Sequence, residues 1–184
     1  YGNLIKPKLK DSLKEAYKNS DLSEISSLFV EKGYNLLKTN GCLVYIITFA
    51  ITFSKGYSPI RCLLRNKFKE TFLFTLDRDR CGTFKNMTQS VSIFKSLNKN
   101  TEKTKGVFTS KFFREFPDIY NIEFSNTDNY LLSTKNDYCR KHRLPKIGEL
   151  INKELLDHLL KFKDNLLSVI QKGSDKIWIR TSGN

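Results

Sequence analysis

A continuous apolar run, Cys42–Thr48, constrains the fold of this chain more than any other feature of the sequence. The run is rich in β-branched and aromatic residues, and it is far shorter than the roughly 18 apolar residues that a membrane-spanning helix needs. A short, unbroken apolar segment of this kind is typical of a strand in a sheet that helices cover on both sides. We therefore expect an α/β protein in which this strand is buried on both faces.

Helical patterns flank the run. Asp21 and Glu24 have the three-residue spacing of a capping box, so we expect a helix to begin there and to end at Asn40–Gly41, where glycine can adopt the left-handed conformation. Ser58–Pro59 opens a second helical pattern, because proline suits the first turn of a helix. A short amphipathic helix is also expected within Lys8–Lys18.

Two further strands are expected at Glu70–Leu76 and Gln89–Leu97, separated by a polar turn region. The order of helix, strand, helix, strand and strand predicts part of an α/β sheet that ends in a β-hairpin. The polar and basic segment 98–106 is the best internal boundary. We therefore expect a first domain over 1–97, a basic linker over 98–106 and an α+β extension over 107–184.

Within the extension the patterns are weaker. Strands are expected at Val107–Phe116 and Ile119–Phe124, and an irregular stretch at Asn126–Arg143. Apolar residues at helical spacing predict a helix over Ile147–Ile170, and Lys176–Arg180 has the character of a short strand.

The charge of the chain indicates an anionic partner. Its 32 lysine and arginine residues exceed 19 aspartate and glutamate residues, which gives a net charge of +13. Such an excess favours nucleic acid, because lysine and arginine contacts to phosphate supply most sequence-independent affinity. A second explanation stays open, since the abundance of Phe, Tyr, Ile, Asn and Lys together is also the bias of an AT-rich genome.

The sequence supports neither a metal site nor one of the common arrangements of catalytic side chains. The four cysteines are widely separated, the two histidines are not at zinc-ligand spacing, and no metal site is expected. Neither a Ser–His–Asp set, a paired-carboxylate signature nor a glycine-rich phosphate loop is present. With no signal peptide and no membrane-spanning run, we expect a reduced, cytoplasmic context.

The order of the motifs along the chain is more informative than any single one. Tyr1–Gly2 precede a helix with the pattern Leu-Leu-Lys-x-x-Gly at Leu36–Gly41, and the apolar strand, the helix around Arg61–Arg65 and the segment Thr83–Phe94 follow. Over Tyr1 to about Lys95 this order resembles the second half of the catalytic domain of N6-adenine-specific DNA methyltransferases, especially those fused to restriction enzymes.

The resemblance implies a partial Rossmann-like methyltransferase sheet and a function in restriction–modification. In that family an Asn-Pro-Pro-Tyr-Gly motif ends a strand, and Tyr1–Gly2 would be its last two residues. We therefore expect the chain to be cut from a longer protein. One departure concerns the residues after the strand, where Thr48–Ala50 stand in place of the family's Pro and small polar residues.

The resemblance also implies a catalytic arrangement. The enzyme extrudes the target adenine from the duplex so that its amine becomes accessible. Tyr1 would stack on the flipped base and Phe84 would contact it from another side, while the acceptors for the amine would lie upstream of Tyr1. The glycine-rich turn that binds S-adenosylmethionine has no counterpart here. We therefore expect the chain alone neither to bind this cofactor normally nor to methylate DNA.

The expected partner is double-stranded DNA, with no membrane and with a fused nuclease or specificity region in the parent protein. The residues expected to contact DNA are Gly2, Lys6, Lys85, Arg140, Lys141 and Arg143. Lysines at the mouth of the expected pocket and the basic stretch Lys135–Lys146 would line a groove, although solvated lysines explain them equally well.

Two other functions stay open. A non-catalytic, basic nucleic-acid-binding module would share the α/β pattern and the charge. A protein-interaction domain whose lysines reflect genome bias would show a mixed-sign surface and no affinity for duplex DNA.

Overall fold

A computed structural model describes residues 5–81, 89–98, 106–128 and 143–162. Several predictions concern residues outside these ranges: the site residues Tyr1, Gly2, Phe84, Lys85, Arg140 and Lys141, most of the 98–106 linker, and the predicted strand at Lys176–Arg180.

The described strands form one five-stranded mixed sheet in the order β1-β3-β2-β4-β5. The strands are β1 (Cys42–Thr48), β2 (Phe68–Leu76), β3 (Val91–Asn98), β4 (Gly106–Phe113) and the short β5 (Ser125–Asn126). Both β1 and β2 pair antiparallel with β3, which lies between them, so β1 and β2 run in the same direction. β4 pairs parallel with β2. The predicted α/β class and the β2–β3 hairpin are confirmed.

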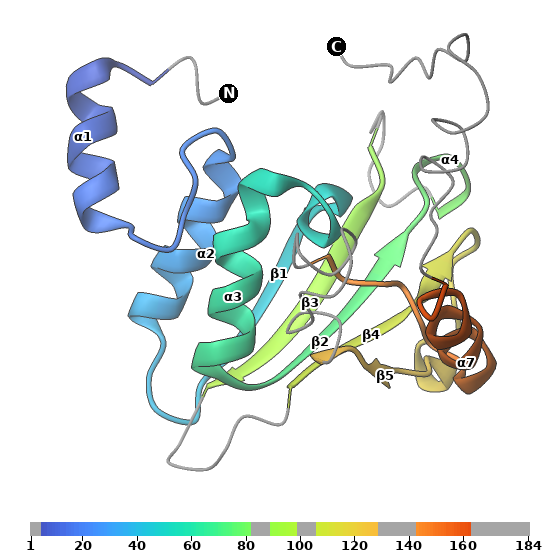
Figure 1. Ribbon diagram of the computed structural model, residues 1–184. Helices are drawn as coiled ribbons and strands as arrows, with labels where there is room; N and C mark the ends of the chain where they lie inside the picture. Colours follow the sequence, from blue (N-terminus) through green and yellow to red (C-terminus); the bar gives the residue numbers. More distant parts are fainter. Residues whose placement is uncertain (1–4, 82–88, 99–105, 129–142, 163–184) are drawn as a thin grey trace, which may run out of the picture.

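Helices α2 (Ile25–Leu36) and α3 (Ser58–Lys67) lie against one face of this sheet (Figure 1). The other described helices are α1 (Pro7–Ala16), the single turn α4 (Arg78–Cys81) and α7 (Leu150–Leu159). Short 3₁₀ turns η2 (Phe49–Thr52) and η3 (Lys55–Tyr57) connect β1 to α3, and η4 (Ile119–Asn121) follows β4. Because α3 joins two parallel strands, it must cross over one face of the sheet.

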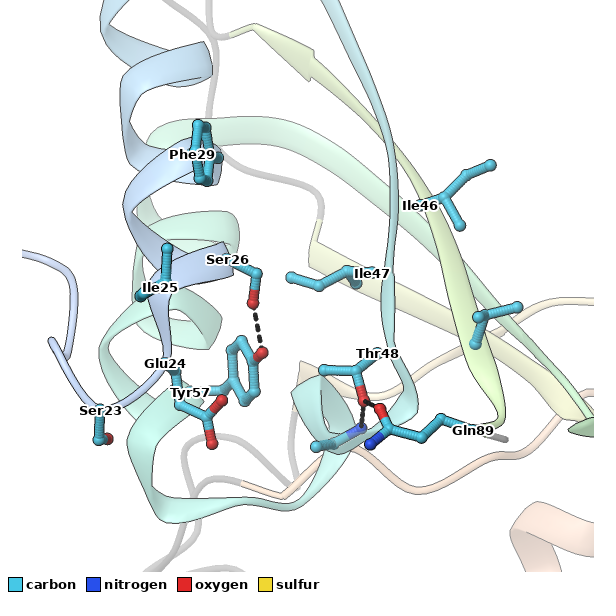
Figure 2. Close-up of a pocket in the computed structure, with 12 residues that line it drawn as sticks. Ser23, Glu24, Ile25, Ser26, Phe29, Ile46, Ile47, Thr48, Tyr57 and Gln89 are labelled. Atoms are coloured by element: carbon cyan, nitrogen blue, oxygen red, sulfur yellow. Dashed lines mark hydrogen bonds between the residues drawn. The ribbon is translucent and has the colours of Figure 1, made fainter. Parts of the chain in front are cut away.

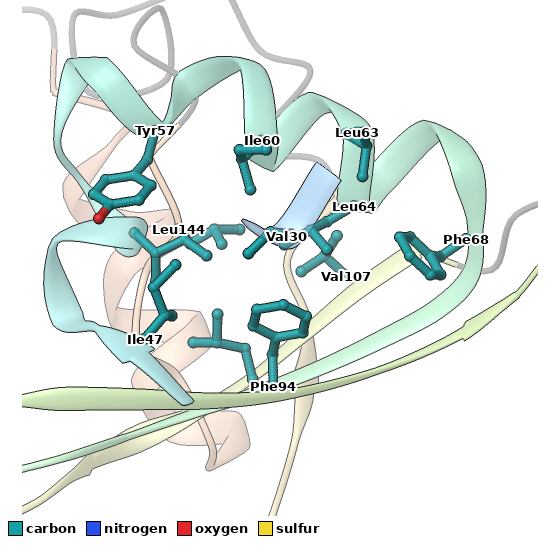
Figure 3. Close-up of a cluster of buried hydrophobic side chains, with 12 residues drawn as sticks. Val30, Ile47, Tyr57, Ile60, Leu63, Leu64, Phe68, Phe94, Val107 and Leu144 are labelled. Atoms are coloured by element: carbon teal, nitrogen blue, oxygen red, sulfur yellow. The ribbon is translucent and has the colours of Figure 1, made fainter. Parts of the chain in front are cut away.

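The main core lies between the sheet and these two helices (Figure 3). Alternate residues of each strand point toward the helices, and Ile47, Leu73 and Phe94 are accordingly buried on this face. The helices contribute Val30, Ile60, Leu63 and Leu64, and the segment before α7 contributes Leu144.

The prediction that Cys42–Thr48 is buried on both faces is wrong for this structure. Val44 is 60% exposed and Ile46 is 46% exposed. β1 stands at the end of the strand order and pairs only with β3 among the described strands. On the helix-covered face of β1, Ile47 is buried and Leu43 and Tyr45 are partly buried, whereas Val44 and Ile46 point to the opposite face.

The ends of α2 also differ from prediction. Asp21 Oδ1 accepts hydrogen bonds from the backbone N–H and the hydroxyl of Ser23, at 2.8 Å each, and Glu24 at the N-cap makes no side-chain cap. The helix ends at Leu36, before the predicted stop. The left-handed residue is Asn40, with φ of 60°, rather than Gly41.

The extension follows its prediction in part. β4 is shorter than the predicted strand, and the segment predicted as a strand at Ile119–Phe124 instead contains η4, where the Asp118 carboxylate accepts a hydrogen bond from Tyr120 N at 3.1 Å. α7 begins at Leu150, later than predicted. β4 belongs to the same sheet as β2, and the division into 1–97, 98–106 and 107–184 stays a prediction.

Candidate functional site

Two adjoining hollows lie at the carboxyl end of β1. The larger, here called the α2–β1 hollow, has a volume of about 700 Å³ and opens between the start of α2 and the strand (Figure 2). Its lining residues are Ser23, Glu24, Ile25, Ser26, Phe29, Ile46, Ile47, Thr48, Ala50, Tyr57, Gln89 and Val91. Polar side chains from Ser23, Glu24 and Ser26 therefore stand beside an apolar wall formed by strand residues.

The second hollow, here called the η2 hollow, measures about 380 Å³. It is lined by Thr48, Phe49, Ala50, Phe53, Arg78, Gln89 and Ser90. Both hollows share Thr48, Ala50 and Gln89. Thr48 Oγ1 donates to Gln89 Oε1 at 3.5 Å and accepts from Ala50 N at 3.4 Å, as Figure 2 shows. These long contacts mark the boundary between the two spaces.

Hydrogen bonds fix the loop that follows β1 and lines the η2 hollow, and one of them joins it to the sheet. Thr48 caps η2 through the contact with Ala50 N. Phe49 N donates to Ser90 O at 3.0 Å, which ties the loop to the residue before β3. Thr52 Oγ1 donates to Phe49 O at 3.0 Å. Side chains that bind backbone within a few residues favour such turns over regular structure.

A buried arginine holds the same loop from the helix side. Arg61 is fully buried, and its Nη1 donates to Ile51 O at 2.8 Å and to Ser54 O at 2.9 Å. Burial, assisted by the nearby charge of Arg143, lowers the pKa of Arg61 to about 10. From the segment before α7, Leu144 N donates to Thr52 O at 2.8 Å. The loop is therefore anchored to both α3 and the extension.

Tyr57 gives the α2–β1 hollow its buried polar group. Its hydroxyl hydrogen-bonds to Ser26 Oγ, which links η3 to α2 (Figure 2). Burial raises the pKa of Tyr57 to about 12, so the phenol is neutral at pH 7. At that pH it can exchange hydrogen bonds with a ligand but cannot act as a base. The hollow is therefore suited to binding and orientation.

Aromatic rings gather at the η2 hollow. The ring centroids of Phe49 and Phe53 are 4.9 Å apart, and Phe112 of β4 lies 5.9 Å from Phe49. Lys146 Nζ lies 4.6 Å from the centroid of Phe49 and 6.0 Å from that of Phe53. Burial lowers the pKa of Lys146. This side of the site combines stacking surface with a partly desolvated cation.

Of the predicted site residues, Lys6 and Arg143 lie in the part of the chain that the structure describes. Lys6 is exposed at the N-cap of α1, and Arg143 lies near enough to Arg61 to affect its pKa. Sequence reasoning missed Phe49, Phe53 and Arg61. Two signals were present: the four-residue spacing of the phenylalanines, and an arginine on the apolar face of a helix.

Two further searches concern the described residues alone. Within them, no group of three or more His, Cys, Asp or Glu side chains is arranged to hold a metal ion. None of the helices in this part of the chain is both long enough and apolar enough to cross a membrane.

Comparisons with known proteins agree with the resemblance found in the sequence. Residues 1–80 match the model of the family described as Eco57I restriction-modification methylase. No curated protein gives a significant match. The resemblance to restriction-modification methylases is thereby confirmed over this part of the chain.

Similar solved structures include the ATP-dependent Type ISP restriction-modification enzyme LlaBIII bound to DNA, at 16% identity and a TM-score of 0.42. They also include the DrdV–DNA complex, at 10% identity and a TM-score of 0.49. The alignments cover 77% and 78% of this chain, but only 10% of the first protein and 16% of the second. The chain therefore spans a small part of the length of these proteins.

Proposed function

We propose, from the match of residues 1–80 to restriction-modification methylases, that this chain is part of an S-adenosylmethionine-dependent DNA adenine-N6 methyltransferase of a restriction–modification system. In this proposal it contributes the wall that holds the extruded base, together with contacts to duplex DNA. The parent protein would carry the remaining parts of the catalytic domain.

The observation that carries the proposal is the place of the two hollows. Both lie at the carboxyl end of β1, and most of the residues that line them belong to the segment that matches the methylase family. In open α/β sheets, ligands bind in crevices beyond the carboxyl ends of the strands. The η2 hollow offers aromatic rings, and stacking on an aromatic ring stabilises an unpaired base by about 1–3 kcal/mol.

Phe84 is the residue that the proposal places against the base. It belongs to the segment that joins Cys81 to Gln89, and Arg78 and Gln89 on either side of that segment both line the η2 hollow. Tyr1 would stack on the base from another direction, as the family resemblance implies. Both roles are part of the proposal.

The cofactor site lies elsewhere in the proposal. S-adenosylmethionine needs the glycine-rich strand and turn of a Rossmann-like sheet, and this sequence has no such turn. The residues of the two hollows do not supply a replacement for it, so they do not fit a complete cofactor site. We therefore expect the 184-residue chain alone to be inactive.

The test is methyl transfer by the protein expressed from its complete reading frame. With labelled S-adenosylmethionine and duplex DNA, the labelled nucleoside should be N6-methyladenine. Phe84→Ala should weaken methyl transfer while leaving cofactor binding unchanged. Tyr120→Ala is the matched control, because Tyr120 is 89% exposed on η4.

Three results would contradict parts of this proposal. Labelled cytosine in place of adenine would exclude adenine specificity. Equal activity of Phe84→Ala and the wild type would show that the pocket wall is misplaced. Salt-dependent DNA binding without any methyl transfer or cofactor binding would favour a non-catalytic nucleic-acid-binding module.

A further inference from the structure

We propose that Lys146, held over the rings of Phe49 and Phe53, binds a backbone phosphate of duplex DNA beside the η2 hollow. The inference rests on the proposed function, because it takes DNA as the partner. It selects one lysine from the basic stretch 135–146 and gives it a ligand.

The first argument is the rigid placement of the segment that carries Lys146. Its neighbours Leu144 and Ile147 are buried. Thr109 Oγ1 donates to Pro145 O at 2.6 Å, and Leu144 N donates to Thr52 O at 2.8 Å. On the other side of Lys146, Ile147 N donates to Thr109 Oγ1 at 3.4 Å. The backbone around Lys146 is therefore fixed to β4 and to the loop that contains η2. A cation on a fixed backbone loses less conformational entropy when it binds a ligand.

The second argument is the electrostatic position of its ammonium group. Lys146 Nζ lies 4.6 Å from the Phe49 centroid, within the range of a cation–π interaction. Burial lowers the pKa of Lys146. In the part of the chain that the structure describes, no carboxylate forms an ion pair with this lysine. A partly desolvated cation without a carboxylate gains strongly from an incoming anion.

Lys111 is a comparable lysine whose ammonium group already has a carboxylate partner. Its Nζ lies 6.0 Å from the Phe113 centroid and 2.6 Å from Glu149 Oε1. Hydrogen bonding and charge attraction from Glu149 raise the pKa of Lys111. Both lysines approach an aromatic ring, but among the described residues a carboxylate pairs with Lys111 and none pairs with Lys146. The two residues therefore form a matched pair for a test.

The position beside the η2 hollow suggests which anion binds. The same two phenylalanine rings that carry Lys146 also line this hollow, where the proposed function places the extruded base. A base on an aromatic surface brings its own backbone phosphates to the rim of the site. A single phosphate contact would position the strand without reading its sequence.

The experiment compares Lys146→Met and Lys111→Met in the 184-residue chain. Each change removes one positive charge, so the loss of long-range attraction is the same. Binding of a fluorescent DNA duplex is measured by anisotropy between 50 and 200 mM salt. Because one phosphate contact contributes about 0.9 to the slope of log K against log salt, Lys146→Met should lower the slope by about that amount. The affinity ratio of wild type to Lys146→Met should shrink about 3.5-fold across this range.

Further variants and conditions complete the test. Lys111→Met should keep the wild-type slope. Lys146→Arg should also keep it, because arginine retains the charge and stacks on aromatic rings. Circular dichroism melting confirms that each variant is folded, and Lys146→Gln replaces Lys146→Met if methionine unfolds the chain. Adding inorganic phosphate at constant ionic strength should leave the Lys146-dependent part of binding unchanged.

The outcomes separate the two proposals. Equal slopes for Lys146→Met and Lys111→Met, with DNA binding intact, would overturn the role of Lys146 alone. Selective competition by inorganic phosphate would assign the site to a free anion and would also overturn it. A wild-type chain that does not bind duplex DNA at low salt would overturn both this inference and the DNA contacts in the proposed function.

Discussion

Replacing Arg61 with methionine tests how the loop after β1 is held. Arg61 is fully buried in α3, and its Nη1 donates to two carbonyl oxygens of the loop, Ile51 O and Ser54 O. Methionine keeps a long, flexible side chain at this position, so it fills much of the same space. The substitution removes the donors without opening a large cavity.

The expected cost follows from the two carbonyls. Ser54 O also accepts from Tyr57 N at 3.2 Å, so it keeps one partner, whereas Ile51 O loses the charged donor. A buried carbonyl left without a donor costs about 1–3 kcal/mol. Removing a buried charge returns part of its desolvation penalty. We therefore expect Arg61→Met to lower the free energy of unfolding by about 2 kcal/mol.

The assay is urea unfolding followed by far-ultraviolet circular dichroism. Arg65→Met is the control on the same helix, because Arg65 is 25% exposed and pairs with Asp128 at 3.3 Å. A partly exposed ion pair of this kind stabilises by no more than about 1 kcal/mol. Equal losses in the two variants would refute the argument that Arg61 anchors the loop through its hydrogen bonds.

The remaining predictions concern stability at three other places. Because the folded pKa of Tyr57 is raised to about 12, its stabilising contribution is complete below pH 10 and falls as the pH rises from 10 to 12. Between pH 10 and 12 the unfolding free energy of Tyr57→Phe should therefore fall less steeply than that of the wild type. The difference between the two slopes should reach about 1.4 kcal/mol per pH unit, measured by urea titration at each pH. Ile46→Lys should change the unfolding free energy by less than about 1 kcal/mol, because Ile46 is 46% exposed. Ile47→Ala should lower it by about 2–5 kcal/mol, because Ile47 is 4% exposed. Similar losses in the two variants would contradict the exposure of the second face of β1. Gly41→Ala should cost about 1–3 kcal/mol in the same assay, because its Cβ would lie 2.8 Å from Lys38 O; an unchanged midpoint would show that the backbone relaxes freely.

Local patterns predicted the elements of this fold better than their arrangement. The strand at β1 and the β2–β3 hairpin are encoded in short apolar segments and the turn between them. That β3 lies between β1 and β2 depends on long-range pairing, which no local pattern reveals. For the same reason, the apolar run Cys42–Thr48 did not indicate that one of its faces is exposed.

The predicted base-holding residues, Tyr1 and Phe84, lie outside the described residues. The hollows at the carboxyl end of β1 are lined by other side chains, which no motif in the sequence indicated. The roles of Tyr1 and Phe84 stay predictions. Lys146 contacts two rings that are far away in the sequence, and Arg61 bonds to carbonyls of the loop that precedes its own helix, so only the folded chain reveals these partners.

The open side of β1 bears on how the chain behaves in solution. Among the described strands β1 pairs with β3 alone. A strand edge without a partner is a template for another chain, and exposed apolar side chains such as Val44 strengthen that attraction. Concentrated samples should accordingly form dimers or larger species by light scattering. Val44→Lys places a charge on the exposed face of β1, so it should keep the protein monomeric without lowering the stability of the core.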